Sequence, residues 1–270
     1  MRRASRPTLP DATSAARVYA LATAAAALPD VQREVEANHD ENRWWPTRIT
    51  DPRMRMLAAG WSTRISYRMI STYAGVLRRA DELGFEALAA LPDDDLSKLI
   101  TPLGLTRTRV TYLRSLADAL LRWEKDGTNL DALGTDAFIE EFADRVSGAS
   151  FKVAQCAVLY ARGYHCGVIP VDSGMVTKLA PALGFGLPHG PAAHEYLRQI
   201  LQHAVHHHAA ELLDLARQHD VTIPLDTEPT WWMHLVLIYF KRLYLNRPPG
   251  HLWRRRPLCN RVVNCPHTST

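Results

Sequence analysis

The stretch DRVSGASFKVA, residues 144–154, joins two segments whose apolar side chains recur at helical spacing. The first segment runs up to Val146, and the second begins at Phe151. Between them stands Gly148, which can adopt the positive φ that reverses a chain at no steric cost. The stretch therefore predicts two helices joined by a tight hairpin.

This hairpin also has a chemical use. The first N–H groups of a helix lack acceptors within the helix, so they can bind a phosphate. Contacts of this kind carry no base information, so they hold nucleic acid regardless of its sequence. We therefore predict that Gly148 and Ser150 bind a nucleic-acid backbone.

The rest of the chain shows the same helical periodicity. On the segment before the hairpin, apolar residues recur at three- and four-residue steps, namely Val110, Leu113, Ala117 and Leu120. Glycine and proline separate segments of about 10 to 20 residues, as they do between helices. Because no segment alternates apolar and polar residues as strands do, the fold class is predicted to be all-α.

The composition is that of a folded globular protein. The chain has 270 residues, 47% hydrophobic and 22% charged, which excludes a wholly disordered or fibrous chain and allows one large domain or two modest ones. Its net charge of +4 permits a nucleic-acid partner without requiring one. Four cysteines without a CxxC pair exclude a disulfide scaffold, so we expect a reducing, cytoplasmic compartment.

The N-terminal region contains no predicted membrane span. Its longest apolar run, Val18–Leu28, is shorter than a span requires, so no membrane association is expected. Residues 1–17 are rich in Arg, Ser, Thr and Pro, and they are predicted to form a disordered tail.

One carboxylate and one lysine stand near the hairpin in the sequence. Asp172 follows the loop residue Pro170 and precedes an apolar segment, so it is predicted to be a helix N-cap. Lys152 lies two residues after Ser150, the last residue of the hairpin turn. Spacing alone does not distinguish this pair from an ordinary cap and an ordinary surface lysine.

A resemblance gives the pair a function. The residues VSGASFKVA, 146–154, followed by VDS, 171–173, resemble the LPGVGxKTA and VDTH pattern of the helix-hairpin-helix DNA glycosylase superfamily, endonuclease III type. Upstream, LGLTRTRVTYL, residues 103–113, is similar to that family's Gly-Leu helix entry with a basic residue five positions later. The similarity covers residues 54–183, and its motifs occur in the family's order.

The resemblance implies a two-lobed helical fold. A barrel-like domain of residues 54–164 would contain the hairpin, and residues 18–53 with 165–270 would form the second domain. The implied function is base-excision DNA repair, in which a glycosylase cleaves the N-glycosidic bond of a flipped damaged or mismatched base. The implied catalytic residues are Asp172, which would stabilise the positive charge on the sugar, and Lys152, which would attack the sugar and add abasic-site lyase activity.

The resemblance also indicates residues that contact DNA. Trp61 aligns near the family residue that fills the gap left by the flipped nucleotide, although a core aromatic is an alternative interpretation. A basic group near the C-terminal end is interleaved with the aromatic residue Trp253. Such a group is suited to binding a phosphate backbone, and a solvated loop is the alternative interpretation. This group consists of Lys241, Arg242, Arg254, Arg255, Arg256 and Arg261.

The chain departs from the family pattern in three places. Ser147 and Ser150 replace a proline and a glycine of the hairpin, and Gly174 replaces the histidine after Val-Asp-Thr. Where the family has four cysteines that hold a 4Fe–4S cluster, this chain has only Cys259 and Cys265. Two thiolates do not hold such a cluster, so no cofactor and no metal are expected.

Two other functions remain open from the sequence. The chain could be a DNA-binding module that keeps the hairpin without catalysis, or an N-glycosidase that acts on a nucleoside outside DNA. For the glycosylase, the expected partner is double-stranded DNA, and we expect a monomer associated with the nucleoid in the cytoplasm.

Overall fold

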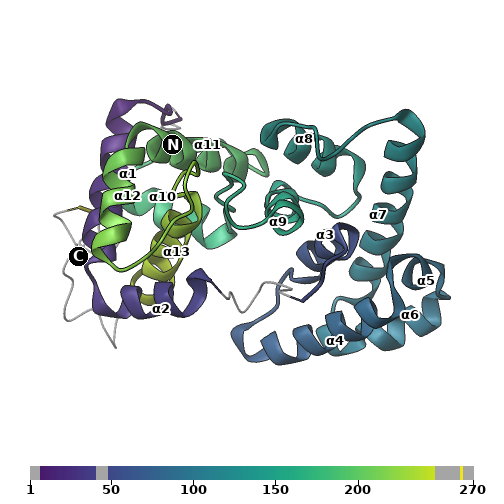
Figure 1. Cartoon of the computed structure of the whole chain (residues 1–270). Coiled ribbons are helices and arrows are strands. Elements are labelled where there is room, and N and C mark those ends of the chain that lie inside the picture. Colours follow the sequence, from purple (N-terminus) through teal and green to yellow (C-terminus); the bar gives the residue numbers. More distant parts are fainter. Residues whose placement is uncertain (1–6, 41–47, 247–261, 264–270) are drawn as a thin grey trace, which may run out of the picture. The chain divides into compact units, whose positions relative to one another are not determined.

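The computed structural model describes residues 7–40, 48–246 and 262–263. The regular elements in these ranges are all α-, 3-10 or π-helices, and none is a strand, which confirms the all-α prediction (Figure 1). The chain divides into two compact units, one of residues 42–166 and one of residues 1–41 with 167–270. This division places residues 42–53 with the hairpin, whereas the sequence-based boundaries placed them in the other domain.

The hairpin unit, residues 42–166, is built on contacts among five of its helices. Helix α9 packs against α3 and α8, and the long helix α7 packs against α3 and α6. Its α-helices are α3 (Pro52–Trp61), α4 (Ile70–Leu83), α5 (Phe85–Ala90), α6 (Asp93–Ile100), α7 (Thr106–Asp126), α8 (Thr135–Arg145) and α9 (Phe151–Arg162). Two short 3-10 turns, η1 (Tyr67–Met69) and η2 (Thr101–Leu103), precede α4 and α7.

Helices α3 and α7 approach so closely that only glycine fits at one position. A Cβ at Gly60 would lie 2.2 Å from a ring atom of Tyr112 on α7. The Tyr112 hydroxyl donates to the backbone carbonyl of Met56 at 2.8 Å. A second buried hydroxyl, that of Tyr73, donates to the carbonyl of Ala58 at 2.8 Å. These contacts hold α3 rigidly in the core of the hairpin unit.

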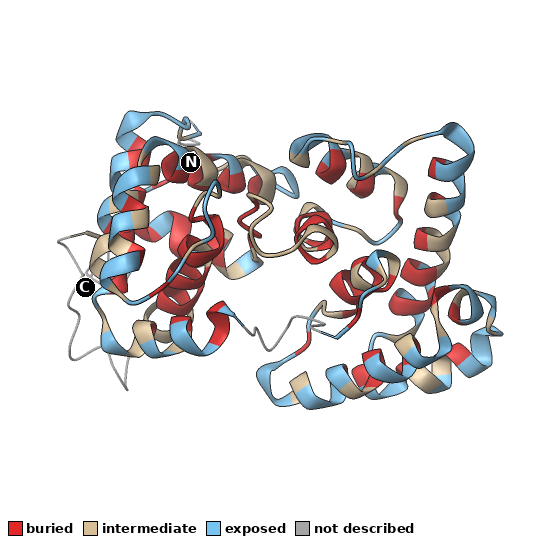
Figure 2. Cartoon of the chain, in the orientation of Figure 1, coloured by how far each residue is buried: buried red, intermediate tan, exposed pale blue. Residues whose placement is uncertain are grey.

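The second unit, named the Asp172 unit here, is built around helix α13. This helix is apolar on every side, as expected of a helix at the centre of a core, and it packs against α1, α2 and α11 (Figure 2). The elements of this unit are α1 (Ala12–Ala26), α2 (Pro29–His39), the π-helical turn η3 (Met175–Leu179), α10 (Ala180–Ala182), α11 (Ala192–His207), α12 (Ala209–Gln218), α13 (Thr230–Phe240) and the π-helical turn η4 (Lys241–Leu245).

The prediction of a disordered tail over residues 1–17 is wrong from residue 12 onward, because α1 begins there. The side chain of Asp11 accepts from the backbone N–H of Ser14, whose hydroxyl accepts from the N–H of Asp11 in return. This capping box starts the helix, and burial of Val18 and Leu21 stabilises it. Residues 1–6 lie outside the described residues.

None of the helices in the described part of the chain combines the length and the apolarity that crossing a membrane requires.

Candidate functional site

The hairpin lies where the sequence predicts it. Helix α8 ends at Arg145 and α9 begins at Phe151, so both predicted boundaries are confirmed. Gly148 adopts a φ of +86°, as expected for the residue that reverses the chain. The turn is anchored to α7, because the Ser115 hydroxyl accepts from the backbone N–H of Ser147 at 2.8 Å.

The start of α9 has the features of an anion-binding site. Ser150 occupies the N-cap position, and its side chain makes no capping hydrogen bond to the helix. Both Ser150 and Gly148 are exposed, and Lys152 on the first turn is half-buried. The first N–H groups of this helix, together with the lysine, can therefore bind a phosphate oxygen.

Asp172 caps the helix that it precedes, as predicted. Its Oδ1 accepts from the backbone N–H of Met175 at 2.7 Å. Its other oxygen, Oδ2, forms an ion pair with the ammonium group of Lys241. The Asp172 side chain keeps 29% of its surface exposed, whereas the Lys241 side chain keeps 2%. The carboxylate is thus held at both oxygens and still reaches the surface.

The Lys241 partner was missed by sequence reasoning, which placed Lys241 in a basic group facing phosphate. That prediction is wrong, because Lys241 is buried and its ammonium group contacts Asp172. The two residues are 69 positions apart in the chain. The sequence carries one weak signal: Lys241 directly follows the apolar segment Thr230–Phe240, where a charged side chain requires a partner.

A neutral histidine also lies in this electrostatic environment. Burial, together with the positive charges of Arg242 and Lys241, lowers the pKa of the His234 imidazole to about 3. Asp172 and a hydrogen bond with the backbone of Pro170 oppose that shift without overcoming it. His234 is therefore uncharged at neutral pH, and Lys241 is the cation that contacts Asp172.

The structure places Trp61 in the core. Its side chain is fully buried, and its indole N–H donates to the backbone carbonyl of Arg109 at 3.2 Å. The prediction that this indole fills a gap in DNA is wrong, because a side chain with no exposed surface cannot stack on a base. The sequence did carry the signal for burial, since Met54, Leu57, Ala58 and Trp61 share one face of α3.

Arg109 joins two turns of the hairpin unit. Its buried guanidinium donates to the carbonyls of Trp61 and Thr63 at the C-terminal end of α3. It also donates to the carbonyls of Leu103 and Gly104 before α7. Burial lowers the pKa of Arg109, but an arginine stays charged in proteins. One buried cation thus holds both turns together.

Each of these turns carries a residue in the left-handed backbone region. Arg64 has a φ of +58° and is exposed, and Leu105 has a φ of +49° with 42% of its surface exposed. Such a conformation is rare for a non-glycine residue, so both residues are candidates for a functional role. Sequence reasoning missed both residues, because nothing in the local sequence requires a positive φ there.

The structure brings together some of the predicted site residues. Gly148, Ser150 and Lys152 share the hairpin, whereas Asp172 lies in the other unit. The remaining predicted residues lie outside the described ones, so their part in the site stays a prediction. They are Arg254, Arg255 and Arg256 of the basic group, and Cys259 and Cys265.

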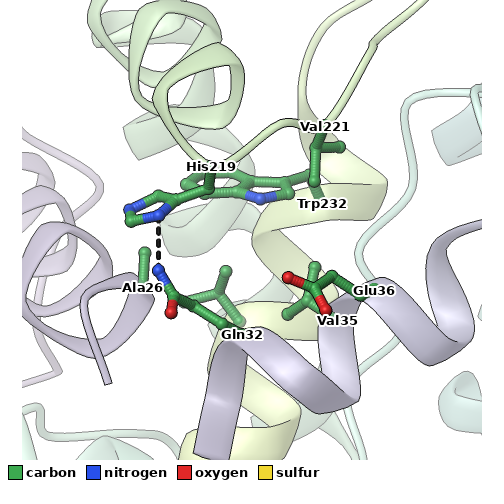
Figure 3. Close-up of a pocket in the computed structure, with 8 residues that line it drawn as sticks. Ala26, Gln32, Val35, Glu36, His219, Val221 and Trp232 are labelled. Atoms are coloured by element: carbon green, nitrogen blue, oxygen red, sulfur yellow. Dashed lines mark hydrogen bonds between the residues drawn. The ribbon is translucent and has the colours of Figure 1, made fainter. Parts of the chain in front are cut away.

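One pocket in the Asp172 unit is too small for a nucleotide. It lies between α2 and α13, and a hydrogen bond of 2.7 Å between the side chains of Gln32 and His219 crosses it (Figure 3). Its volume of about 10 Å³ has room for a single water molecule. This pocket is part of the core and not a base-binding site.

The histidine-rich end of α11 does not form a metal centre. The rings of His203 and His207 stack with centroids 6.0 Å apart. No group of three or more His, Cys, Asp or Glu side chains among the described residues is placed to hold a metal ion.

Comparisons with known proteins agree with this geometry. The sequence model of a family described as HhH-GPD superfamily base excision DNA repair protein matches residues 62–230. Among solved structures, the chain is similar to the H. pylori 3-methyladenine DNA glycosylase bound to 1,N6-ethenoadenine, with a TM-score of 0.56 and 14% sequence identity. That match covers 87% of this chain and 99% of the other. No curated protein sequence matches the chain.

Proposed function

Because this chain belongs to the HhH-GPD superfamily of base excision DNA repair proteins, we propose that Asp172 is the carboxylate that drives its N-glycosylase reaction. The observation that carries this proposal is the carboxylate itself, held at both oxygens and still 29% exposed. A preorganised anion acts most strongly where positive charge develops in the transition state.

The reaction follows from that geometry. As the N-glycosidic bond breaks, its electron pair leaves with the base and the anomeric carbon becomes cationic. The Asp172 carboxylate stabilises this cation, and a water molecule then adds to the carbon. The proton that the water loses goes to the departed base or, where the base leaves uncharged, to solvent. The base must first leave the helical stack, because the bond is inaccessible within a duplex.

In this proposal the hairpin binds the DNA backbone. The N–H groups at the start of α9 and the exposed Ser150 hydroxyl bind a backbone phosphate without reading the sequence. In place of the buried Trp61, Leu105 and Arg64 enter the space left by the flipped nucleotide. An apolar wedge presented on a rigid turn is the side chain that DNA-distorting proteins insert between bases.

The substrate is a modified base in double-stranded DNA, and alkylated adenine is the class to test first. The similar H. pylori protein is a 3-methyladenine DNA glycosylase and was solved with 1,N6-ethenoadenine. Purified protein should release base from a panel of duplexes that each carry one modified base. Turnover of free nucleosides without DNA would favour the nucleoside glycosidase, and binding to abasic DNA without any turnover would favour the non-catalytic module.

Lys152 decides whether the enzyme also cleaves the DNA strand. If its amine displaces the base, a Schiff base forms with the sugar, and borohydride should trap a covalent adduct with DNA. We expect Lys152→Ala to abolish the adduct and Lys152→Gln to leave DNA binding largely intact, because the backbone N–H groups of the hairpin remain. The exposed Lys125 on α7 provides the matched control, and its alanine variant should keep the adduct.

The adduct can be located, because the chain contains only five lysines. An adduct that survives both Lys152 substitutions would contradict this role. Base release without any adduct would show a glycosylase that uses water alone.

We further propose that no iron–sulfur cluster is bound, since Cys259 and Cys265 provide two of the four thiolates that a cubane needs. Protein purified without oxygen should be colourless and free of stoichiometric iron. Iron near four atoms per chain, the content of a cubane, would contradict this.

The enzyme is proposed to act as a monomer on the nucleoid in the cytoplasm. DNA is the substrate of its family, and one chain carries both the hairpin and the carboxylate. Sedimentation of the purified protein, alone and with a duplex, tests the one-to-one complex.

A further inference from the structure

Lys241 cannot act on the substrate itself. Its side chain keeps 2% of its surface exposed, against 29% for the Asp172 side chain that it contacts. A buried ammonium is costly unless an anion compensates it, and Asp172 Oδ2 is the anion in contact with it. The ion pair therefore joins the Asp172 carboxylate, which reaches the surface, to the Lys241 ammonium group, which is buried.

Among the described residues, Lys241 forms the ion pair with Asp172, and the charged groups near this pair lie on four elements. On α13, His234 is neutral because burial lowers its pKa to about 3. On η4, the Arg242 guanidinium stacks over the Tyr239 ring at 5.2 Å, and on η3, Lys178 is exposed. On α11, which packs against η3, the buried Arg198 is paired with Glu195. Removal of Lys241 would take away the contacting positive charge.

Gly174 makes room for the ammonium group. A Cβ at this position would lie 2.8 Å from Lys241 Nζ and 3.2 Å from Asp172 Oδ1. Because the backbone of Gly174 has a φ of −72°, alanine is conformationally acceptable there. The absence of a side chain is therefore required by the ion pair and not by the backbone.

From these contacts we infer that Lys241 is a positioning residue for the reaction: its buried ammonium keeps the Asp172 carboxylate ionised and fixes the direction of its exposed edge. This inference rests on the proposed role of Asp172. Oδ1 is aligned by the N–H of Met175 and Oδ2 by Lys241, so the carboxylate cannot rotate about its Cβ–Cγ bond without losing both partners.

The pH dependence of base excision tests the inference. Single-turnover excision rates are measured in buffers from about pH 4.5 to about pH 8.5, on a duplex that carries one 1,N6-ethenoadenine or 3-methyladenine. In Lys241→Met we expect the acid limb of the profile to move up by about one pH unit or more, because an adjacent cation no longer favours the anion. The rate at neutral pH should fall about tenfold or more, with DNA binding preserved.

Two further variants separate charge from shape. Gly174→Ala should move the acid limb in the same direction, because its Cβ displaces the ammonium group from the carboxylate. Lys241→Arg keeps the charge, so its acid limb should stay close to that of the wild type. The matched control is Lys178→Met, which removes an exposed lysine from η3, the turn that Asp172 caps, and should leave the acid limb unchanged.

A double-mutant cycle in urea unfolding provides a readout that needs no substrate. Asp172→Asn and Lys241→Met should each destabilise the protein, and the double variant should lose less than their sum. An unmoved acid limb in both Lys241→Met and Gly174→Ala, or additive stabilities, would overturn the inference. Wild-type excision by Asp172→Asn would overturn the proposed function instead, so the two failures are distinguishable.

Discussion

Asp172→Asn is expected to lose about 100-fold or more of the single-turnover excision rate, the cost of removing one preorganised electrostatic group. Asparagine has nearly the same shape, and its side-chain oxygen can still accept from the N–H of Met175. It carries no charge, so the developing sugar cation loses its counter-ion. Binding to a duplex with an abasic-site analogue should persist, because the effect falls mainly on the transition state.

A matched control for this variant is Asp226→Asn. Asp226 is exposed in the same unit and has a φ of +63°, a conformation that asparagine tolerates well. It should keep the wild-type rate. Asp172→Asn leaves Lys241 buried without its anion, which can destabilise the fold. Far-ultraviolet circular dichroism should therefore first show that this variant is folded. A folded variant with wild-type turnover would exclude Asp172 from catalysis.

Arg109→Met is expected to lower the free energy of unfolding of the hairpin unit by about 3 kcal/mol or more, the size of effect that loss of a buried, hydrogen-bonded charge produces. The guanidinium donates to four backbone carbonyls, those of Trp61, Thr63, Leu103 and Gly104. Methionine fills much of the volume but donates to none of them. Urea unfolding measures the loss of stability, and hydrogen exchange at the two turns shows whether they open more readily.

The control for Arg109 comes from one of the turns that it holds. Leu105→Ala removes an exposed side chain, so its free energy of unfolding should change by less than about 0.5 kcal/mol. If Leu105 enters DNA, this variant should still bind an abasic duplex more weakly. A stable Arg109→Met variant with unchanged exchange at both turns would show that the buried cation does not hold them.

The sequence by itself determined the features that depend on neighbouring residues. The hairpin follows from apolar spacing on both sides of Gly148, whose φ of +86° needs no distant contact. The N-cap role of Asp172 follows from the residues after it, because a cap bonds within its own first turn. The family pattern around these residues led to the correct superfamily.

Local signals were weaker guides where two interpretations competed. The predicted tail contained the Asp11–Ser14 capping box, and a mixed composition outweighed that signal. For Trp61, a partial alignment indicated the DNA surface, whereas the apolar face of α3 indicated the core. The core position won, because burying the large apolar surface of an indole stabilises the fold, whereas an exposed indole leaves that surface in water.

Only the tertiary structure decided how the charges are partnered. Lys241 meets Asp172 across 69 residues because η3 and η4 pack together, and no local pattern encodes that contact. Arg109 reaches the carbonyls of Trp61 and Thr63 in the same way, from a helix far along the chain. A buried charge has to find its partner wherever the fold brings one, and that partner need not be near in sequence.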